Sequence, residues 1–332
     1  MATFSALVRD RSSFVRKSIR LAMSSSGIGL RPLAGGNHFP LVSFDEVQEV
    51  IAGAILRAKP FLVARFGKSE LDVSISMAAG KDFSIPSKIL RRLFHSDASR
   101  YQDVSFIHLG TSGFYPTNDR ESLALFSKLY LSNVELIDVL GSWVASEQLI
   151  ADRVAAGWIC NLHDLDPFLA ASPWTWALEG KKVLVVSPFR DSILQQYRKR
   201  ELLFGEKRFL PSFSLQCLPA PVTFNTGPST SEKFSESWFE AMERLTRQVS
   251  EADFDVLISG AGSYGLTAAA EAKRTGRVGI NLGGTTQLLF GIWGRRWDSY
   301  PQYARLLNPH WVRPLPSEVP GNANEIEGAA YW

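Results

Sequence analysis

Residues 254–265 read FDVLISGAGSYG, and this stretch decides the fold class of the chain. Phe254–Ser259 is a short apolar run typical of a buried strand, and the glycine-rich turn Gly260–Gly265 follows it directly. A helix to about Thr275 and another strand at Arg277–Leu282 are expected next. Strands and helices that alternate through short connections predict a parallel α/β sheet with right-handed crossovers.

The segment before this stretch repeats the same alternation. Lys181–Ser187 (KKVLVVS) is a nearly continuous β-branched run, which is typical of a strand covered by helices on both faces. Helices are predicted from Asp191 to about Leu203 and over Phe234–Glu251, and residues 211–230 are predicted to form a strand and a long loop. The second half of the chain therefore favours a mostly parallel sheet.

The first half gives weaker signals of the same kind. Ser43 and Glu46 form a capping-box pattern before a helix that ends at Lys59-Pro60. A strand is expected at Phe61–Ala64 and another at Val104–Leu109. Further helices are predicted over 119–131 and 142–155.

Composition limits the classes of protein. The chain has 332 residues, with 36 Lys+Arg against 33 Asp+Glu, so its formal charge is only +3. This balance excludes a strongly basic nucleic-acid-binding surface and an acidic disordered chain. Cys160 and Cys217 have no CxxC spacing, which predicts neither a disulfide framework nor a zinc site and favours the cytoplasm. We expect a basic extension over 1–35 and a folded Rossmann-like domain over 36–332, with a potential division into lobes at 36–175 and 176–332.

The N-terminal extension allows three interpretations. Residues 1–30 contain Arg9, Arg11, Arg16, Lys17 and Arg20 against the single acid Asp10, and apolar residues recur among them at loosely helical spacing. The segment is compatible with a surface helix on anionic lipid at the inner face of a membrane, with an organelle transit segment, or with a frayed tail. No transmembrane helix is expected, because the longest uncharged run contains four glycines and several polar residues.

The glycine turn is the first candidate binding site. Glycines let a backbone approach a phosphate, and the next helix offers free amides, so the turn residues are candidate phosphate contacts: Gly260, Gly262, Ser263, Tyr264 and Gly265. A dinucleotide fold needs an acid at the end of the next strand, but that strand ends in INLGG at 280–284. A phosphate contact, a purely structural turn and an NAD site remain open. Gly283, Gly284 and Thr285 precede another helix and offer amides in the same way.

Two other strand ends carry charged or polar residues. Arg190 and Ser192 follow the strand at Lys181–Ser187, where ligands bind in open sheets, although Arg190 can equally be a solvated charge. The turn Arg65–Glu70 follows the strand at Phe61–Ala64. Glu70 is a candidate general base or metal ligand, or a structural partner of Arg65. The five histidines show no metal-ligand spacing, and no GxSxG, P-loop or HExxH motif is present.

At this point the motifs resemble a known family. Arg65-Phe66-Gly67-x-x-Glu70 is similar to the RFGDGE turn of the GT-D glycosyltransferases. The second half resembles a bacterial branch found with polysaccharide-assembly enzymes, through SPFRDSILQQY (187–197), FDVLISGAGSYG (254–265), INLGGTTQLLFGIWGRRW (280–297) and the segment 308–332. The resemblance covers roughly residues 40–332. It implies a Rossmann-like, GT-D-like domain that transfers a sugar from a nucleotide-diphosphate sugar to a surface glycan or glycolipid.

One difference from the family affects the chemistry. In GT-D enzymes the Asp and Glu of the turn hold a divalent metal, but Lys68 and Ser69 stand where the family has Asp and Gly. The resemblance thus assigns the catalytic roles to Glu70, Lys68 and Arg65, with Lys68 in place of Mg²⁺ or Mn²⁺ at the diphosphate. A metal bound through other acids such as Asp72, an inactive scaffold of a glycan-assembly complex, and an NAD-dependent oxidoreductase are the alternatives. Weaker candidates are the acids Asp138, Glu147 and Glu327 and the stacking aromatics Trp143, Trp293 and Trp297.

Overall fold

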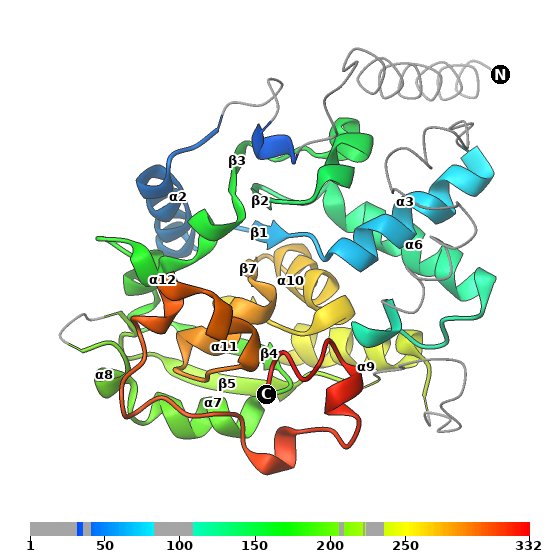
Figure 1. Ribbon diagram of the computed structural model, residues 1–332. Helices are drawn as coiled ribbons and strands as arrows, with labels where there is room; N and C mark the ends of the chain where they lie inside the picture. Colours follow the sequence, from blue (N-terminus) through cyan, green and yellow to red (C-terminus); the bar gives the residue numbers. More distant parts are fainter. Residues whose placement is uncertain (1–31, 36–40, 83–108, 206–208, 222, 224–235) are drawn as a thin grey trace.

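The computed structural model describes residues 32–35, 41–82, 109–205, 209–221, 223 and 236–332. The N-terminal segment 1–31 and nearly all of the strand expected at Val104–Leu109 lie outside the described residues, so their predictions are not tested. The described chain alternates strands and helices from β1 to the C-terminal segment, as Figure 1 shows.

The centre of the fold is a parallel β-sheet of seven strands in the order β3-β2-β1-β7-β6-β4-β5. All the strand pairs are parallel; for example, Val63 lies between Val139 and Ile280. The strands are β1 (Phe61–Arg65), β2 (Val139–Ser142), β3 (Trp158–Asn161), β4 (Lys182–Ser187), β5 (Ser214–Pro219), β6 (Val256–Ser259) and β7 (Val278–Asn281). The predicted Rossmann-like α/β fold is therefore confirmed, and strands from both halves of the chain join one sheet.

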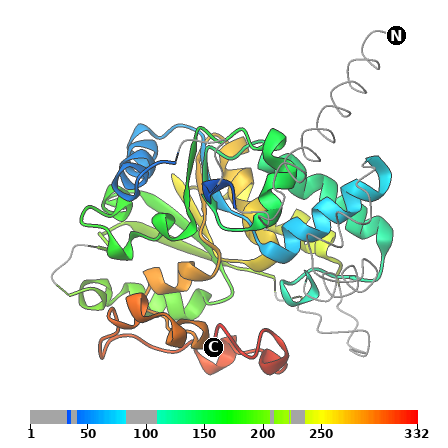
Figure 2. The same ribbon diagram turned by 45° about the horizontal axis from the view of Figure 1, so that its top comes forward.

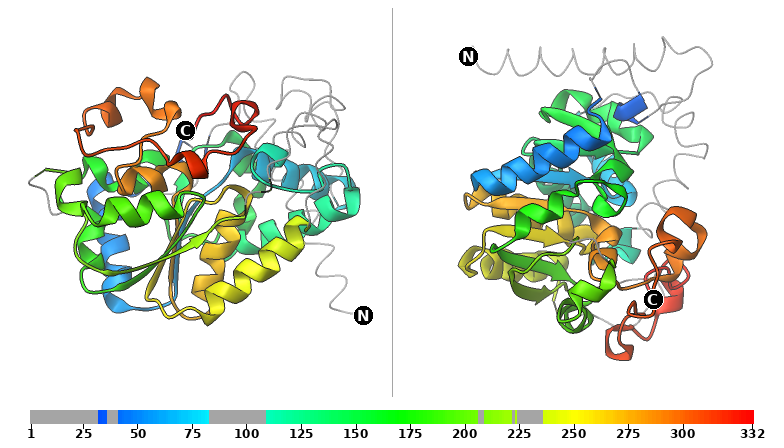
Figure 3. Two further views of the ribbon diagram at one scale, coloured as in Figure 1. Left: turned by 90° about the horizontal axis from the view of Figure 1, so that it is seen from below. Right: turned by 90° about the vertical axis from the view of Figure 1, so that its left-hand side faces the viewer.

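Helices cover both faces of the sheet, as Figures 2 and 3 show. One face packs against α3 (Lys68–Asp82), α6 (Arg120–Val134), α9 (Trp238–Glu251) and α10 (Gly265–Arg274). The other face packs against α2 (Phe44–Arg57), α7 (Arg190–Tyr197), α8 (Arg200–Leu203), α11 (Thr286–Leu289) and α12 (Pro301–Ala304). Among the described residues, no helix is long and apolar enough to cross a bilayer.

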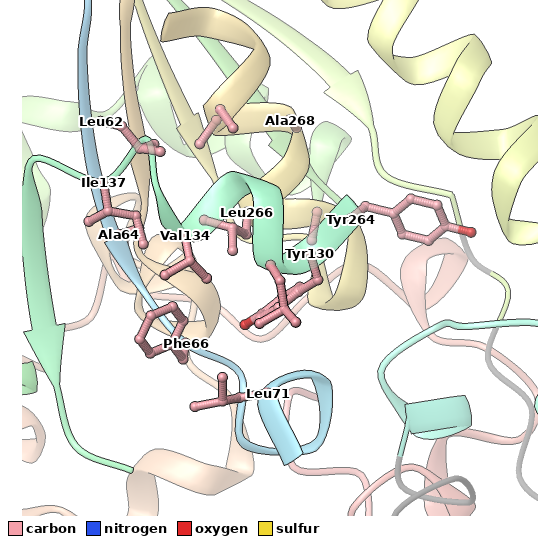
Figure 4. Packing of buried hydrophobic residues seen from close by; sticks show 14 of the residues in the cluster. Leu62, Ala64, Phe66, Leu71, Tyr130, Val134, Ile137, Tyr264, Leu266 and Ala268 are labelled. Atoms are coloured by element: carbon pink, nitrogen blue, oxygen red, sulfur yellow. The ribbon is translucent and has the colours of Figure 1, made fainter. Parts of the chain in front are cut away.

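Burial on both faces explains why the strands read as continuous apolar runs. In β1, Leu62 and Ala64 point into the α6–α10 side of the core, whereas Val63 packs on the other side. Figure 4 shows the first side, where Val134 of α6 and Leu266 of α10 face β1. Each successive strand residue therefore contacts a helix layer, as expected of a parallel sheet.

The predicted helix over 142–155 is wrong. Residues 139–142 form β2, a 3₁₀ segment follows at Ala145–Arg153, and β3 was not expected from the sequence. The physical reason is Glu147, whose buried carboxylate accepts hydrogen bonds from the amides of Trp143 and Val144 and from the Leu33 amide. These bonds fix the turn after β2, and the 3₁₀ segment that follows is interrupted by non-helical dihedral angles at Ile150 (φ −119°, ψ 15°), so no regular α-helix spans 142–155. The helix expected to run to Leu203 is also divided, into α7 and α8.

The C-terminal segment 290–332 lies along one end of the sheet, coloured orange to red in Figure 3. Ile292 forms a parallel bridge with Val312, and the amide of Arg296 donates to the carbonyl of Ala330 at 2.7 Å. These two contacts join parts of the segment to one another. Glu327, Tyr331 and Trp332 of the segment line a cavity together with residues at the carboxyl ends of the central strands.

Candidate functional site

A cavity of about 180 Å³ lies over the carboxyl ends of β1, β7, β6 and β4. The chain leaves β1 and β6 towards helices on one face, and leaves β7 and β4 towards helices on the other. Such a divergence is where open α/β sheets bind ligands. We call this the central cavity; its polar and aromatic lining includes Arg65, Lys68, Ser69, Glu70, Thr111, Ser112, Tyr130, Trp143, Ser187, Asn281, Thr286, Gln287, Arg296, Glu327, Tyr331 and Trp332, and its glycines are Gly67, Gly260, Gly262, Gly283 and Gly284.

The turn between β1 and α3 brings Glu70 over Gly67. A β-carbon at position 67 would lie 2.0 Å from Oε2 of Glu70, so only glycine leaves room for this carboxylate. Glu70 is only 6% exposed. Burial raises the pKa of the Glu70 carboxyl. Three interactions oppose this shift: a hydrogen bond from the backbone of Glu70 itself, the positive charge of Arg65, and a hydrogen bond from Ser112. The spacing Gly67-x-x-Glu70 therefore has a direct steric cause.

Arg65, at the end of β1, is a half-buried cation that pairs with no carboxylate among the described residues. Its Nε and Nη2 donate to the carbonyl of Phe66 at 3.1 and 2.9 Å. Its guanidinium lies 5.0 Å from the ring centroid of Trp143, whose Nε1 donates to the same carbonyl at 2.8 Å. Because Phe66 occupies only two of the five guanidinium donors, the remaining N–H groups are available to an anion.

Lys68 lies at the rim of the central cavity, with 59% of its side chain exposed. Its Nζ is 2.5 Å from Oδ2 of Asp72, one helical turn further along α3. The other oxygen of the buried Asp72 accepts a bond from Ser146 at 2.6 Å. The ammonium group of Lys68 thus lies beside the cavity, while Asp72 is held by two protein partners.

The described residues do not fit the divalent metal that the resemblance implies. Glu70 and Glu327 are the acidic residues that line the cavity, and no group of three His, Cys, Asp or Glu side chains gathers within the described part of the chain. Asp72, the alternative ligand, is absent from this lining and pairs with Lys68. Mg²⁺ at a phosphate site is usually held by one or two carboxylates together with waters and substrate oxygens. Here Glu327 is already paired with Arg296, and the cations Arg65 and Lys68 line the same cavity, so the charge of the site does not favour a divalent cation.

Tyr130 is a site residue that the sequence did not indicate. It is buried on α6, and its hydroxyl oxygen accepts a hydrogen bond from the amide of Gly67 at 3.3 Å. Burial and the nearby Glu70 raise the pKa of the phenol well above its ordinary value. In the sequence Tyr130 is one of several apolar residues on the buried face of a helix, so no local pattern distinguishes it.

The glycines at 260 and 262 are required by packing between neighbouring loops. A β-carbon at Gly260 would lie 2.6 Å from the carbonyl oxygen of Gly283, and one at Gly262 would lie 2.3 Å from that of Ser112. Gly262 also has a φ of +52°, which favours glycine. Both line the central cavity, but their close approaches are to the chain itself, which is the structural interpretation of the turn.

The remaining turn residues lie in the core rather than in the cavity. Ser263 accepts a bond from Nε1 of Trp238 at 2.9 Å, and Tyr264 stacks on that indole with ring centroids 5.3 Å apart. A β-carbon at Gly265 would lie 2.8 Å from Oδ1 of Asn281. Asn281 ends β7, where an NAD site would need an acid, so this geometry does not favour a dinucleotide.

The loop after β7 supports the prediction that its glycines lie at the site. Gly283 has a φ of +61°, and a β-carbon there would lie 2.7 Å from Nη1 of Arg65. Gly283 and Gly284 both line the central cavity. Thr285 lies in the wall of a neighbouring cavity instead, and its hydroxyl donates to the carbonyl of Leu282 at 3.1 Å.

Arg190 and Ser192 are close to the same edge but do not line the cavity. Arg190 pairs with Asp191 at 2.9 Å and donates to the carbonyl of Cys217, in agreement with its interpretation as a solvated charge. The amides of Asp191 and Ser192 donate to Oε1 of Glu318 at 2.7 and 3.2 Å, and the Ser192 hydroxyl donates to Oε2. A carboxylate of the protein therefore occupies the anion site predicted at the start of α7.

The C-terminal segment supplies a wall that the sequence only partly indicated. Arg296 lies 4.4 Å from the ring centroid of Tyr331 and forms an ion pair with Glu327. Gln287 is buried beside them, and its Oε1 has no hydrogen-bond partner among the described residues. Glu327, one of the weaker candidates from the sequence, lines the central cavity.

The other weak candidates have structural partners. Asp138, which precedes β2, accepts bonds from Lys273 at 2.6 Å and from the Leu62 amide at 2.7 Å. Glu147 forms the turn after β2, as described above. Trp293 donates to Asp298 at 2.7 Å. None of these three residues, two acids and one tryptophan, lines the central cavity.

A second cavity of about 610 Å³ adjoins the first, and we call it the side cavity. It shares Arg65, Trp143, Gly284 and Arg296 with the central cavity. Its other lining residues are Pro32, Ala34, Ser142, Asn161, Leu162, His163, Leu165, Asp166, Leu282, Thr285, Trp297 and Tyr300. The site therefore has two compartments with a common wall.

Comparisons with known proteins place this geometry in no family. No protein-family model, no curated protein and no solved structure gives a significant match with the chain. The resemblance to the GT-D glycosyltransferases consequently rests on the motifs and on their order along the sequence.

Proposed function

We propose that the protein is a glycosyltransferase that moves a sugar from a nucleotide-diphosphate sugar to a surface glycan or glycolipid acceptor. The observation that carries this proposal is Arg65, a half-buried guanidinium without a carboxylate partner in the described part of the chain, at the carboxyl edge of a parallel sheet. A half-buried guanidinium with unused N–H donors can bind an anion, and a diphosphate matches these donors well. The cytoplasm, at the inner face of a membrane, is the location we propose.

Charge supplies the chemistry in this proposal. When the bond between the sugar and the diphosphate breaks, negative charge accumulates on the leaving diphosphate, and fixed cations and amides stabilise it. Arg65 would contact the diphosphate most directly, because Lys68 and Arg296 already pair with Asp72 and Glu327. Lys68 would add positive charge from the rim. The amides of Gly283 and Gly284 line the same cavity.

Glu70 and the aromatics would orient the donor. The Glu70 carboxyl is buried next to Arg65 and Ser112, a position suited to hold a sugar hydroxyl. Trp143, Tyr331 and Trp332 line the central cavity and provide flat apolar surfaces for the sugar or the base. Because the described side chains do not fit a divalent cation, no step of this proposal passes through a metal.

A binding experiment with a matched control tests the proposal. Thermal shift and calorimetric titration of the full chain with UDP-, GDP-, CMP- and dTDP-sugars, with and without Mn²⁺, should identify at least one donor that binds. Losing a hydrogen bond to a charged group costs about 1.5–3 kcal/mol, so Arg65→Gln should weaken that donor roughly 10- to 100-fold. Arg190→Gln, which removes an exposed arginine outside the cavity, should leave the affinity unchanged.

The same panel can reject the proposal. If the folded chain neither binds nor hydrolyses any of these nucleotide sugars, it is not a glycosyltransferase of this kind. Equal losses of affinity in Arg65→Gln and Arg190→Gln would show that general charge, rather than the central cavity, attracts the donor.

A further inference from the structure

We infer that the side cavity binds the acceptor and that Nε2 of His163 removes the proton from the acceptor hydroxyl during transfer. This inference rests on the proposed function, since it assigns the second substrate of that reaction. Four observations carry it: the tautomer of His163, the burial of its partners, the wall shared with the central cavity, and the charges around the imidazole.

The hydrogen bonds around His163 determine which nitrogen carries the proton. The hydroxyl of Tyr303 lies 2.5 Å from Oδ2 of Asp166, and Nδ1 of His163 lies 2.8 Å from that hydroxyl and 3.3 Å from Oδ2. In this pair the Tyr303 hydroxyl is the donor and the carboxylate oxygen of Asp166 is the acceptor. Nδ1 must then donate to the Tyr303 oxygen and to Oδ2. The neutral imidazole therefore carries its proton on Nδ1, which leaves the lone pair on Nε2.

The burial of these groups directs Nε2 outwards. Asp166 is 3% exposed and Tyr303 is fully buried, whereas half of the His163 side chain is exposed. Because Nδ1 faces the buried pair, the opposite edge of the ring is the part exposed to the side cavity that His163 lines. Within the described residues Nε2 forms no hydrogen bond. A base oriented by a carboxylate through its other nitrogen is the arrangement that activates hydroxyl nucleophiles.

The two cavities meet at Arg65. Arg65, Trp143, Gly284 and Arg296 line both of them, and the charge of Arg65 acts on Glu70 in one and on His163 in the other. An acceptor in the side cavity would therefore meet the donor sugar where the two cavities adjoin, beside these shared residues. The side cavity has a volume of about 610 Å³, which is within the usual range for small-ligand pockets. It is therefore large enough for a sugar unit.

The proposed step balances as follows. The acceptor oxygen forms a bond to the anomeric carbon of the donor sugar, and the bond from that carbon to the diphosphate oxygen breaks. The electron pair of the broken bond leaves with the nucleoside diphosphate, whose new charge Arg65 stabilises. The acceptor proton moves to Nε2 of His163 and afterwards to water, so no other reactant is required.

The charges near the imidazole set the pH range of this step. The hydrogen bond to Asp166 raises the pKa of His163, burial opposes this shift, the charges of Asp166 and Asp164 add to it, and Arg65 opposes it. Tyr300 and Tyr303 contact the ring from the α12 side. The base must be neutral to act, so the rate should fall as the pH decreases through the raised pKa.

A structural role is the competing explanation, since His163 also joins the 3₁₀ segment Leu162–Leu165 to Tyr303 of α12. The experiment therefore compares His163→Gln and His163→Ala with His310→Gln, a histidine whose side chain lies outside both cavities. The acceptor probes are octyl glycosides, with water as an acceptor that is always present. Release of nucleoside diphosphate from the donor identified above is the readout.

We expect both His163 variants to bind the donor with unchanged affinity and to release nucleoside diphosphate roughly 100- to 10,000-fold more slowly, as for loss of a general base. Added imidazole should restore part of the rate in His163→Ala but not in His163→Gln, where the amide fills the space. A merely structural histidine gives no such rescue. The wild-type rate should show an acidic limb, and His310→Gln should behave as wild type.

The outcomes separate this inference from the proposed function. If no nucleotide sugar binds, the proposed function fails first. If the donor binds through Arg65 but His163→Gln releases nucleoside diphosphate within about twofold of the wild-type rate, the inference is wrong and the glycosyltransferase proposal stands. Should both variants unfold, a wild-type rate profile without an acidic limb would overturn the inference by itself.

Discussion

The carboxylate of Glu70 lies directly over Gly67, at a distance where a β-carbon on residue 67 would be 2.0 Å from Oε2. The amide of Gly67 donates to the hydroxyl of Tyr130, so this one residue also joins the turn to α6. In the turn between β1 and α3, the backbone of Gly67 therefore packs against a buried acid on one side and bonds to a phenol on the other.

Replacing Gly67 should disturb this unit. Gly67→Ala forces Glu70 to move, and such overpacking costs about 1–3 kcal/mol of the free energy of unfolding. Denaturant titration measures the loss, and donor affinity should fall at the same time. Gly157→Ala is the control, because nothing lies within 4 Å of its β-carbon position. Equal stability of the two variants would contradict the steric role of Gly67.

Lys68→Asp tests whether the lysine replaces a metal. The substitution removes the ion pair with Asp72 and puts three carboxylates on the first turns of α3. If Lys68 neutralises the diphosphate, the rate of transfer should drop at least about tenfold, and Mn²⁺ should not restore it. Lys182→Asp, which breaks the ion pair of another half-exposed lysine with the exposed Asp253 outside the cavity, should have no effect on transfer.

A gain of activity in Lys68→Asp with Mn²⁺ would instead indicate that the protein itself is not an enzyme. A wild-type chain without transferase activity that gains activity with Lys68→Asp and Mn²⁺ would be an inactive relative, in line with a scaffold in a glycan-assembly complex. The comparison therefore separates a metal-independent enzyme from a non-catalytic partner.

The buried Glu70 should make stability depend on pH in a definite direction. Its pKa in the folded protein is raised above the ordinary value of 4.5 by burial. Between these two values the unfolded chain loses the proton while the folded chain keeps it, so the free energy of unfolding decreases as the pH rises through this window. The stability that protonated Glu70 contributes is fully present below pH 4.5.

Denaturant titrations at several pH values measure this decrease. Glu70→Gln should remove the part of it that belongs to this residue, whereas the exposed Glu179→Gln should follow the wild-type curve. Parallel curves for wild type and Glu70→Gln would show that burial of Glu70 does not raise its pKa.

Part of this fold and site follows from the sequence alone. The strands at β1, β4, β6 and β7 were predicted because each is a dense apolar run followed by a turn, and their carboxyl ends bring Arg65, Lys68, Glu70 and the glycines 260, 262, 283 and 284 to one cavity. Strands β2 and β3 were missed, because the turn between them depends on Glu147, whose bonds reach as far as Leu33.

Several of the predicted site residues that lie outside the central cavity share one feature, which is that each pairs with a residue far away in the sequence. Ser192 was expected to face a ligand, but Glu318, 126 residues later, occupies its amide. Ser263 and Tyr264 were expected at the phosphate, but Trp238 holds both in the core. His163 showed no pattern because its partner Tyr303 lies 140 residues away. Spacing along the sequence does not reveal such contacts.

The carbonyl of Phe66 couples two side chains that line both cavities. The oxygen of Phe66 accepts hydrogen bonds from Arg65 and from Trp143 together, so these two side chains compete for the same lone pairs. A ligand that draws Nε or Nη2 of Arg65 away leaves the oxygen to the indole and fixes Trp143 more firmly. Because Trp143 and Arg65 line both cavities, a substrate that binds in one of them would thereby change the affinity of the other, and by linkage the effect is reciprocal.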